Sequence, residues 1–447
     1  MQSDNLTKNK SYTLEESVSH LIDYRGKTPK KTNSGIPLVT AKIVKKGRLE
    51  PYNEFIGEDN YDSWMIRGIP KKGDIVLTVE APLGEVAQLD DTKIALAQRI
   101  VTLRGKKNIL NNDYLLYLLQ SREVQSQLEA RSSGSTVKGI KQSELRKVVL
   151  NLPPLVTQKK IANILSTLDD KIELNRKMNQ TLEEMAQALF KSWFVDFDPV
   201  NALKNRDGED LETIASNLGI SKEVLELFPS EFEESELGMI PKGWRVSTIE
   251  DEVSIYGGAT PSTKEDKYWL GGKNHWATPR DLSGLNSKVL IDSSRKITDD
   301  GVNKISSKQL PTGTILLSSR APVGYIAYST VPISINQGFI AMVCNKQLSN
   351  YFVMYWLDIA MSEIKNRAIG TTFAEISKSS FRPIKLVVPT QEILFKFNNQ
   401  VQPMVDKIIK NENEIKTLQK TRDTLLPKLL SGELDVSRID TDNLEDN

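Results

Sequence analysis

Apolar residues recur with alternating spacings of four and three in two long segments of the chain. One series runs from Ile161 to Trp193 and the other from Phe397 to Leu429. A 4-3 alternation over more than four heptads is typical of a coiled coil. We therefore predict two long helices that pair along this seam. The seam positions expected are Leu165, Leu168, Ile172, Asn175, Leu182, Leu189, Met404, Ile408, Asn411, Ile415, Leu418 and Leu425.

Two of these seam positions are polar. Asn175 and Asn411 are equivalent, because the two seams stay in phase at an offset of 236 residues. In an antiparallel pair they would lie near one another, and a buried Asn pair fixes the register of two helices at a cost in stability. The alternative is that both amides face solvent.

The chain also repeats itself outside the helices. PKKGDIVLTVEAPLGEVA at 70–87 matches LPTGTILLSSRAPVGYIA at 310–327, and LRKVVLNLP at 145–153 matches FRPIKLVVP at 381–389. The Gly-Ser-Thr at 134–136 matches the Gly-Thr-Thr at 370–372. Two copies offset by about 240 residues indicate a tandem duplication rather than a solenoid, whose units are about 20–50 residues long.

In each copy, short strand signals with Gly and Pro turns precede a long helix. We expect an α+β fold, with two similar mixed α/β domains separated by two long antiparallel helices that form a coiled coil, related by pseudo-twofold symmetry. The expected boundaries are 1–154 for the first domain, 155–196 for the first helix, 197–240 for an acidic linker, 241–389 for the second domain, 390–432 for the second helix and 433–447 for an acidic tail.

Charge is distributed unevenly along the chain. The formal net charge is +1, but residues 1–150 carry 24 Lys and Arg against 18 Asp and Glu, and residues 241–388 carry 18 against 12. Residues 195–240 carry 3 against 12. Both domains are therefore basic, and acidic connecting segments hide this in the total. A basic domain is a weak indication of a nucleic-acid partner, because solvated basic faces are common.

Motifs for catalysis or metal binding are missing from the sequence. Two His residues, one Cys, and no glycine-rich phosphate loop give no catalytic or metal site. Cys344 lies in an apolar run and is expected to be a core residue, and Asp196 and Asp198 are expected to cap a helix. With no run of about 18 apolar residues and no signal-peptide pattern, we expect a soluble, cytoplasmic protein.

The chain resembles the specificity subunit of type I restriction–modification systems over nearly its whole length. The resemblance rests on ATPSTKEDKYWLGG with HWATPRDLSG (259–284), on both Ala-Pro segments, on GSTVKGI and GTTFAEI, and on the helical segments 152–200 and 418–434. It implies two target-recognition domains that each read one half of an asymmetric bipartite DNA site, with the helices as a spacer. It also implies a non-catalytic chain that binds no cofactor, assembled with two methyltransferase subunits and, in the full complex, two restriction subunits that translocate DNA. Those partners would use S-adenosylmethionine, ATP and Mg.

The residues that contact DNA are the least determined part of this interpretation, since any single Lys or Arg can simply face solvent. Glu80 and Arg320 occupy equivalent positions, which suggests a specificity position, because carboxylates suit cytosine and arginine suits guanine. Phe190, Trp193 and Phe194 are candidates for docking the methyltransferase subunits, and packing within the helix pair is the alternative. Other functions to be tested are a coiled-coil assembly scaffold without DNA readout and a self-sufficient methyltransferase or nuclease. The candidate DNA-binding residues are Lys27, Lys31, Lys42, Lys138, Arg280, Arg320 and Arg367.

Overall fold

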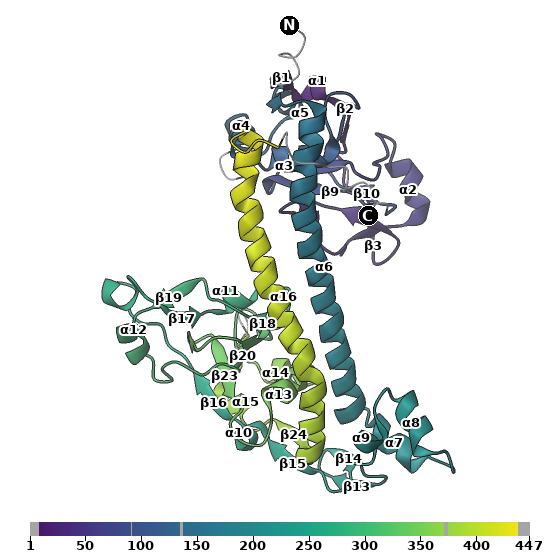
Figure 1. The fold of residues 1–447 in the computed structure, drawn as a ribbon, viewed down its shortest axis with the longest axis vertical. Helices are drawn as coiled ribbons and strands as arrows, with labels where there is room; N and C mark the ends of the chain where they lie inside the picture. The colour runs from purple at the N-terminus through teal and green to yellow at the C-terminus, as the bar shows by residue number, and fades with distance from the viewer. Residues whose placement is uncertain (1–8, 91, 135–136, 371–373, 437–447) are drawn as a thin grey trace. The chain divides into compact units, whose positions relative to one another are not determined.

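The computed structural model describes residues 9–90, 92–134, 137–370 and 374–436 (Figure 1). The chain divides into two compact units, which are residues 1–171 with 417–447, and residues 172–416. Each unit combines one mixed α/β domain with a stretch of both long helices. The predicted α+β class, with two similar domains and two long helices, is confirmed.

In unit 1 the central sheet has the order β2-β11-β8-β9, and all its neighbours are antiparallel. All five residues of β8 are buried, as the continuous apolar run IVLTV requires. Two further sheets have the orders β10-β4-β7-β3 and β1-β12, and β5 pairs with β6. The strands are β1 (Lys10–Thr13), β2 (Val18–Asp23), β3 (Lys31–Thr32), β4 (Ile36–Val39), β5 (Val44–Lys45), β6 (Arg48–Leu49), β7 (Phe55–Ile56), β8 (Ile75–Val79), β9 (Leu83–Gln88), β10 (Ala95–Leu96), β11 (Ile100–Gly105) and β12 (Val149–Leu152).

Of the helices of the first domain, α3 and α4 pack against this sheet. The Asn111 side chain caps α3 by accepting a hydrogen bond from the backbone N–H of Tyr114 at 2.8 Å. Most of α3 is buried, so this helix supplies much of the core of unit 1. The helices are α1 (Leu14–Ser17), α2 (Glu58–Trp64), α3 (Asn112–Leu119), α4 (Arg122–Ala130) and α5 (Gln142–Leu145).

Unit 2 repeats this arrangement with a five-stranded sheet of order β16-β23-β20-β21-β18. A three-stranded sheet has the order β19-β17-β22, and two pairs, β13-β14 and β15-β24, complete the domain. The strands are β13 (Phe232–Ser235), β14 (Gly238–Pro241), β15 (Arg245–Thr248), β16 (Ser254–Gly257), β17 (Asn274–Ala277), β18 (Val289–Leu290), β19 (Arg295–Ile297), β20 (Ile315–Ser318), β21 (Ile326–Ser329), β22 (Ile333–Ile335), β23 (Phe339–Val343) and β24 (Lys385–Val388).

The segment expected as an acidic linker, 197–240, is folded. It forms three short helices and the β13-β14 hairpin, and Val200, Ile214 and Phe228 are buried in the main core of unit 2. The segment was expected to be a linker because of its acidic charge, but its scattered apolar residues allow it to fold against the core. The helices of unit 2 are α7 (Asp198–Lys204), α8 (Leu211–Asn217), α9 (Lys222–Leu225), α10 (Ile249–Glu252), η1 (Asp266–Tyr268), α11 (Pro279–Leu282), α12 (Asp299–Asn303), α13 (Asn350–Ile359), α14 (Met361–Asn366) and α15 (Lys378–Phe381).

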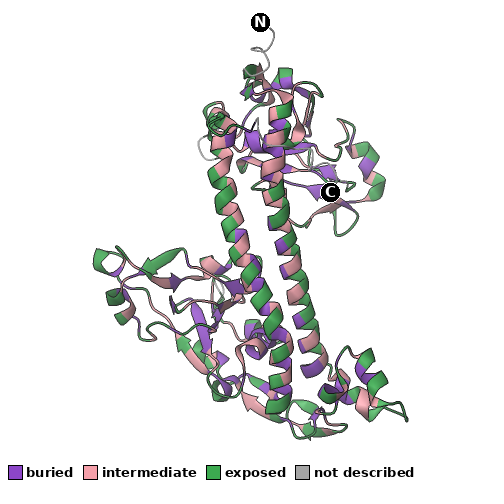
Figure 2. Cartoon of the chain, in the orientation of Figure 1, coloured by how far each residue is buried: buried purple, intermediate pink, exposed green. Residues whose placement is uncertain are grey.

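The two long helices are α6 (Leu155–Phe194), of 40 residues, and α16 (Gln391–Ser431), of 41 residues. Each contributes to both units. Figure 2 shows buried positions recurring along each helix between exposed ones. Every expected seam position is buried or half-buried. Among the described residues, no helix combines the length and the apolar character needed to cross a bilayer. Of the expected acidic tail, residues 437–447 lie outside the described part.

Candidate nucleic-acid interface

A turn of sequence Ala-Pro joins β8 to β9 in unit 1. The peptide bond between Ala81 and Pro82 is cis. The buried hydroxyl of Thr78 accepts a hydrogen bond from the backbone N–H of Glu85 at 2.9 Å, which ties the turn to the strand. Ala81 has a φ of +49°, a left-handed conformation that costs a residue with a Cβ about 1–2 kcal/mol.

Unit 2 contains the same turn between β20 and β21. The peptide bond between Ala321 and Pro322 is cis, and Ala321 has a φ of +54°. The buried Ser318 hydroxyl donates to the carbonyl oxygen of Pro322 at 2.8 Å and accepts from the N–H of Gly324 at 3.1 Å. Left-handed backbone held in place by its surroundings is often found at functional sites. Because this conformation is present in both copies, the turn is a candidate functional site.

Two other segments of unit 1 meet the end of β8. The Val79 N–H donates to the carbonyl oxygen of Arg99 at 3.0 Å, and the Val79 carbonyl oxygen accepts from the N–H of Ile140 at 3.0 Å. The next residue, Glu80, forms an isolated antiparallel bridge with Gly139. We call this meeting point the junction of unit 1, and it comprises residues 79–82, 98–99 and 137–140.

The junction of unit 2 is built by the same bonds. The Ser319 N–H donates to the carbonyl oxygen of Gly338 at 2.8 Å, and its carbonyl oxygen accepts from the N–H of Ile376 at 3.0 Å. Arg320 forms the antiparallel bridge here, with Glu375. This junction comprises residues 319–322, 337–338 and 374–376.

The two ends of a repeated loop lie beside each junction. Ser133 bridges Gly139 in unit 1, and Ile369 bridges Glu375 in unit 2, so each bridge closes a loop that contains the Gly-Ser-Thr or Gly-Thr-Thr segment. Residues 135–136 and 371–373 of these loops lie outside the described part. A described end of this loop therefore contacts the residue that precedes the Ala-Pro turn in each unit.

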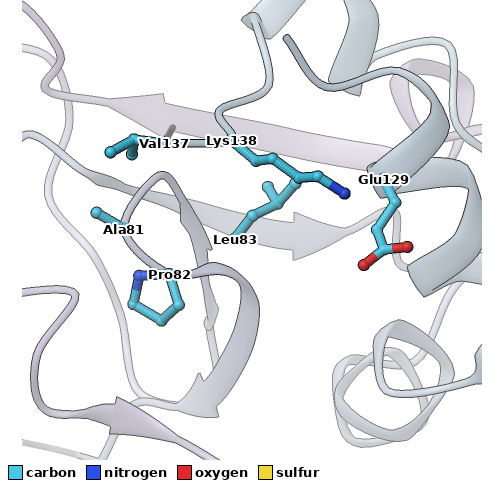
Figure 3. A pocket seen from close by; sticks show the side chains of 6 residues that line it. All are labelled: Ala81, Pro82, Leu83, Glu129, Val137 and Lys138. Atoms are coloured by element: carbon cyan, nitrogen blue, oxygen red, sulfur yellow. The ribbon is translucent and has the colours of Figure 1, made fainter. Parts of the chain in front are cut away.

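Two hollows flank the turn of unit 1, and Ala81 lines both of them. The first, of about 230 Å³, has Lys31, Lys42 and Arg99 in its lining, together with Thr28. Cationic side chains around a concave surface suit contact with phosphates. The second hollow, of about 350 Å³, is shown in Figure 3 and is lined by Ala81, Pro82, Leu83, Glu129, Val137 and Lys138.

Glu54 offsets part of the charge of the first hollow. Its carboxylate lies 2.5 Å from Nζ of Lys31 and 3.3 Å from Nζ of Lys42. The hydrogen bond from Lys31 is the main reason that the pKa of Glu54 lies below its ordinary value, and Lys42 lowers this pKa further. The two lysine side chains keep 48% and 76% of their surface exposed, so both remain accessible to a phosphate.

The lysines predicted for the first domain thus surround its junction. Lys31 and Lys42 line the first hollow, and Lys138 lines the second. Lys27 is exposed next to Thr28, a residue of the first hollow. Sequence reasoning missed Arg99, which is exposed at the junction. The sequence signal that could have found Arg99 is the match between AQRI at 97–100 and NQGF at 336–339.

Two of the three arginines predicted for the second domain lie at or beside its junction. Arg320 belongs to the junction, with Nη1 3.7 Å from the carboxylate of Glu375. Arg280 is exposed on α11, next to Pro279. The Pro279 ring lies so close to Gly338 that a Cβ on this glycine would be 2.9 Å from Cγ of the proline.

Arg367 is engaged by partners of its own. Its Nη2 lies 2.6 Å from the carboxylate of Glu363, and its Nη1 donates to the carbonyl oxygen of Ser380 at 3.2 Å. These bonds indicate a structural role at the end of α14. Arg367 is therefore a weaker candidate for DNA contact than Arg320.

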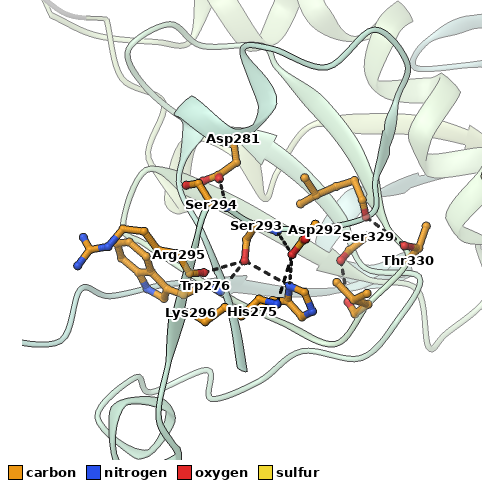
Figure 4. A network of polar contacts seen from close by, with 12 residues as sticks. His275, Trp276, Asp281, Asp292, Ser293, Ser294, Arg295, Lys296, Ser329 and Thr330 are labelled. Carbon is orange, nitrogen blue, oxygen red and sulfur yellow. Dashed lines mark hydrogen bonds and ion pairs between the residues drawn. The ribbon is translucent and has the colours of Figure 1, made fainter. Parts of the chain in front are cut away.

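A second cationic group lies on β17 and β19 (Figure 4). The guanidinium carbon of Arg295 lies 3.7 Å from the ring centroid of Trp269 and 5.3 Å from that of Trp276. Such stacking holds a guanidinium in one orientation. Nearby, Nδ1 of His275 lies 3.2 Å from the carboxylate of Asp292, but burial lowers the pKa of His275 and Lys296 lowers it further. The pKa of His275 thus lies below its ordinary value, and the cations of this group are Arg295 and Lys296.

A polar network joins the helix pair of unit 2 to its domain. Nδ2 of Asn411 donates to Oδ1 of Asn179 at 2.8 Å, and Nδ2 of Asn179 donates to Glu412 at 2.9 Å. The same Glu412 oxygen accepts from the hydroxyl of Ser287 at 2.7 Å. The amides that lie between the helices thus also determine where the domain attaches.

The predicted contact between Asn175 and Asn411 is wrong. Asn411 is bonded to Asn179, one helical turn beyond Asn175, and Asn175 donates instead to Glu414 at 3.0 Å. The helices are antiparallel, as expected, but their register differs by one turn from that assumed. The prediction that the amides are buried was right, since Asn175 and Asn411 are 1% and 0% exposed.

The aromatic residues proposed for docking are in the core. Phe190, Trp193 and Phe194 are 2%, 1% and 8% exposed, and they pack with Phe352 and Phe397 in the core of unit 2. They are therefore not a docking surface as the chain is folded. The alternative, internal packing, is what the structure contains.

In unit 1 the helices attach through a different set of bonds. The carboxylate of Asp169 accepts from Arg422 at 2.6 Å and from the Tyr117 hydroxyl at 2.9 Å. Leu165 and Leu429 are buried in the core that they share with the first domain. Within the described residues, no group of three His, Cys, Asp or Glu side chains could hold a metal ion.

Comparison with known proteins identifies the family. The model of the type I restriction modification DNA specificity domain matches the chain twice, over residues 20–184 and 241–421. The chain belongs to the type I restriction–modification specificity family. Each match contains one junction and part of one long helix, so the duplication inferred from sequence is a duplication of this family's domain.

Relatives within this family cover most of the chain. The HindI specificity subunit of Haemophilus influenzae is 31% identical over 81% of this chain and 87% of its own length. The MjaIX specificity subunit of Methanocaldococcus jannaschii is 31% identical over 82% of this chain and 79% of its own length. The solved structure of the type I S subunit from M. genitalium, at 18% identity, covers 96% of this chain and 98% of its own, with a TM-score of 0.56. This last likeness supports the specificity-subunit fold.

Proposed function

We propose that this chain is the subunit that gives a type I restriction–modification complex its DNA sequence specificity. Each domain reads one half of an asymmetric bipartite site, and the helix pair sets the distance between the halves. The observation that carries this proposal is the junction, which is built twice from the same backbone bonds and lies among exposed cations. Because the side chains differ between the copies, the two half-sites should differ in sequence.

In this proposal the chain itself performs no chemistry. It binds no cofactor, and two methyltransferase subunits, which use S-adenosylmethionine, dock on the outer faces of the helices and methylate adenine. Two restriction subunits, which use ATP and Mg, complete the complex. The family membership supports this division of labour, and the proposal places the complex in the cytoplasm beside the DNA that it modifies.

DNA binding is tested by a salt titration of the complex with its methyltransferase subunits. Contacts from Lys and Arg to phosphates predict affinity that falls steeply with salt. A map of methylated adenines should then show one bipartite motif with a fixed gap. Binding that is absent or independent of salt would contradict the proposal and favour an assembly scaffold without DNA readout. Methylation by the chain alone would favour a self-sufficient methyltransferase.

The spacer role is tested by lengthening both helices. A second copy of residues 165–171 inserted after Lys171, with a second copy of 417–423 before Thr417, keeps the heptad phase and supplies a second Asp169 and Arg422 pair. Seven residues add about 10 Å of helix, or about three base pairs. The gap should lengthen while both half-sites stay unchanged. An unchanged gap would contradict the spacer role, and the same insertion in α6 alone serves as the control for disrupted pairing.

A further inference from the structure

The two junctions share one backbone frame but display different side chains. Each displays one arginine, one glutamate and one glutamine, yet the arginine and the glutamate occupy different places on the frame. The equivalent positions, with unit 1 first, are Glu80 and Arg320, Gln98 and Gln337, Arg99 and Gly338, and Gly139 and Glu375.

Local packing explains why the arginine occupies a different position in each junction. In unit 1, Arg99 is exposed and, within the described residues, its side chain has no partner. In unit 2 the equivalent Gly338 has no room for a side chain, because Pro279 would lie 2.9 Å from its Cβ. The arginine of that junction is instead Arg320, which directly precedes the turn.

Electrostatics explain why the glutamate also occupies a different position in each junction. At the bridged positions, unit 2 sets Glu375 beside Arg320, which is favourable. A glutamate at Gly139 would face Glu80, because a Cβ there would lie 3.4 Å from Cγ of Glu80. The identities at the two bridged positions are therefore coupled in each junction.

We propose that these four positions determine the bases that each domain reads, with Arg99 as the main reader in unit 1 and Arg320 in unit 2. This proposal rests on the proposed function. Arginine pairs with guanine through two hydrogen bonds, glutamine pairs likewise with adenine, and glutamate accepts from cytosine. A rigid backbone frame with exchangeable side chains provides different readouts from one fold.

The test compares maps of methylated adenines made by the whole complex with different specificity subunits. Arg99→Ala should relax one base position in one half-site, with discrimination reduced by about 5- to 150-fold, as loss of a bidentate contact predicts. Arg99→Lys should relax the same position, because an ammonium lacks the two-pronged geometry of a guanidinium. Arg320→Ala should change only the other half-site.

Lys107→Ala is the matched control, since this exposed lysine follows the opposite end of β11 from Arg99. It should leave the motif unchanged. A uniform loss of methylation with an unchanged motif, restored by Arg99→Lys, would overturn the proposal and make Arg99 a phosphate contact. An unchanged map for Arg99→Ala would also overturn it. If the wild-type complex produces no motif, it is the proposed function that fails.

Discussion

Asn411 and Asn179 bond to each other across the helix pair of unit 2, where both side chains are almost fully buried. A leucine pair would give a more stable seam, but leucines accept several registers, whereas two amides bond in only one. Because Asn179 also bonds Glu412, which bonds Ser287, this register is transmitted to the second domain.

Replacing one of these amides should destabilise the chain. Asn411→Ala leaves the buried amide of Asn179 without its donor, so the free energy of unfolding should fall by about 1–3 kcal/mol. Urea unfolding followed by circular dichroism measures this change. Asn399→Ala, at an exposed position of the same helix, should change stability by less than about 0.5 kcal/mol. Equal effects of the two substitutions would contradict a role for the buried pair.

Glu54→Gln should strengthen DNA binding. The substitution removes the negative charge that Lys31 and Lys42 share, so neither lysine has to give up an ion pair to contact a phosphate. Affinity at low salt should rise severalfold, and the slope of log affinity against log salt should steepen by about one. Fluorescence anisotropy over a range of salt concentrations measures both quantities. Glu58→Gln, an exposed carboxylate that lines neither hollow, is the control.

The same residue contributes to the dependence of stability on pH. The pKa of Glu54 is lowered in the folded chain, so its stabilising effect is present above the unfolded pKa, near 4.5, and is lost as pH falls through the lower folded value. Unfolding curves between pH 7 and pH 3 should therefore show a smaller loss of stability for Glu54→Gln than for the wild type. A parallel loss in both proteins would contradict this assignment.

Cys344 should resist alkylation in the folded chain. The residue is half-buried against the core of unit 2, and burial raises the pKa of its thiol to about 12. At pH 8 the thiolate fraction is then about 10⁻⁴, compared with about a quarter for a free thiol. The rate of reaction with iodoacetamide, followed by mass spectrometry, should be lower by at least about a thousandfold than in urea. Rapid labelling of the native chain would show that this part of the core is open.

Trp193→Ala should act on folding rather than on assembly alone. Truncating a fully buried tryptophan costs about 3–5 kcal/mol, so the melting temperature of the isolated chain should fall clearly. Met185→Ala, on an exposed face of the same helix, should leave it nearly unchanged. If Trp193→Ala impaired only the binding of methyltransferase subunits, the docking interpretation would return.

The sequence predicted the parts of this structure that depend on local periodicity and on repetition. The 4-3 spacing from Ile161 to Trp193 gave the first helix closely, because a seam leaves a regular trace in the chain. The pairing register of the two helices could not be predicted from this spacing, because sliding one helix by a turn keeps apolar residues opposite each other. The cross-helix bonds of Asn179 and Asn175 separate the two registers.

The candidate interface was predictable in part for a related reason. Lys138 follows the repeated Gly-Ser-Thr motif, and the fold brings it and the clustered lysines Lys31 and Lys42 to hollows beside the same turn. Arg99 was missed because its importance depends on the backbone bond to Val79, a contact that no local pattern encodes. Arg367 was included because a charge count cannot detect that Glu363 already holds it.

The division of the chain also has a consequence for its synthesis. Unit 2 is one continuous segment, whereas unit 1 needs residues 417–436, which leave the ribosome after all of unit 2. Leu429 and Val436 fill the core in which Leu165 lies, so the first domain stays incomplete until they arrive. We therefore expect the domain that is translated first to finish folding last. A chain released before residue 417 would retain all of unit 2 and lack the C-terminal part of the core of unit 1.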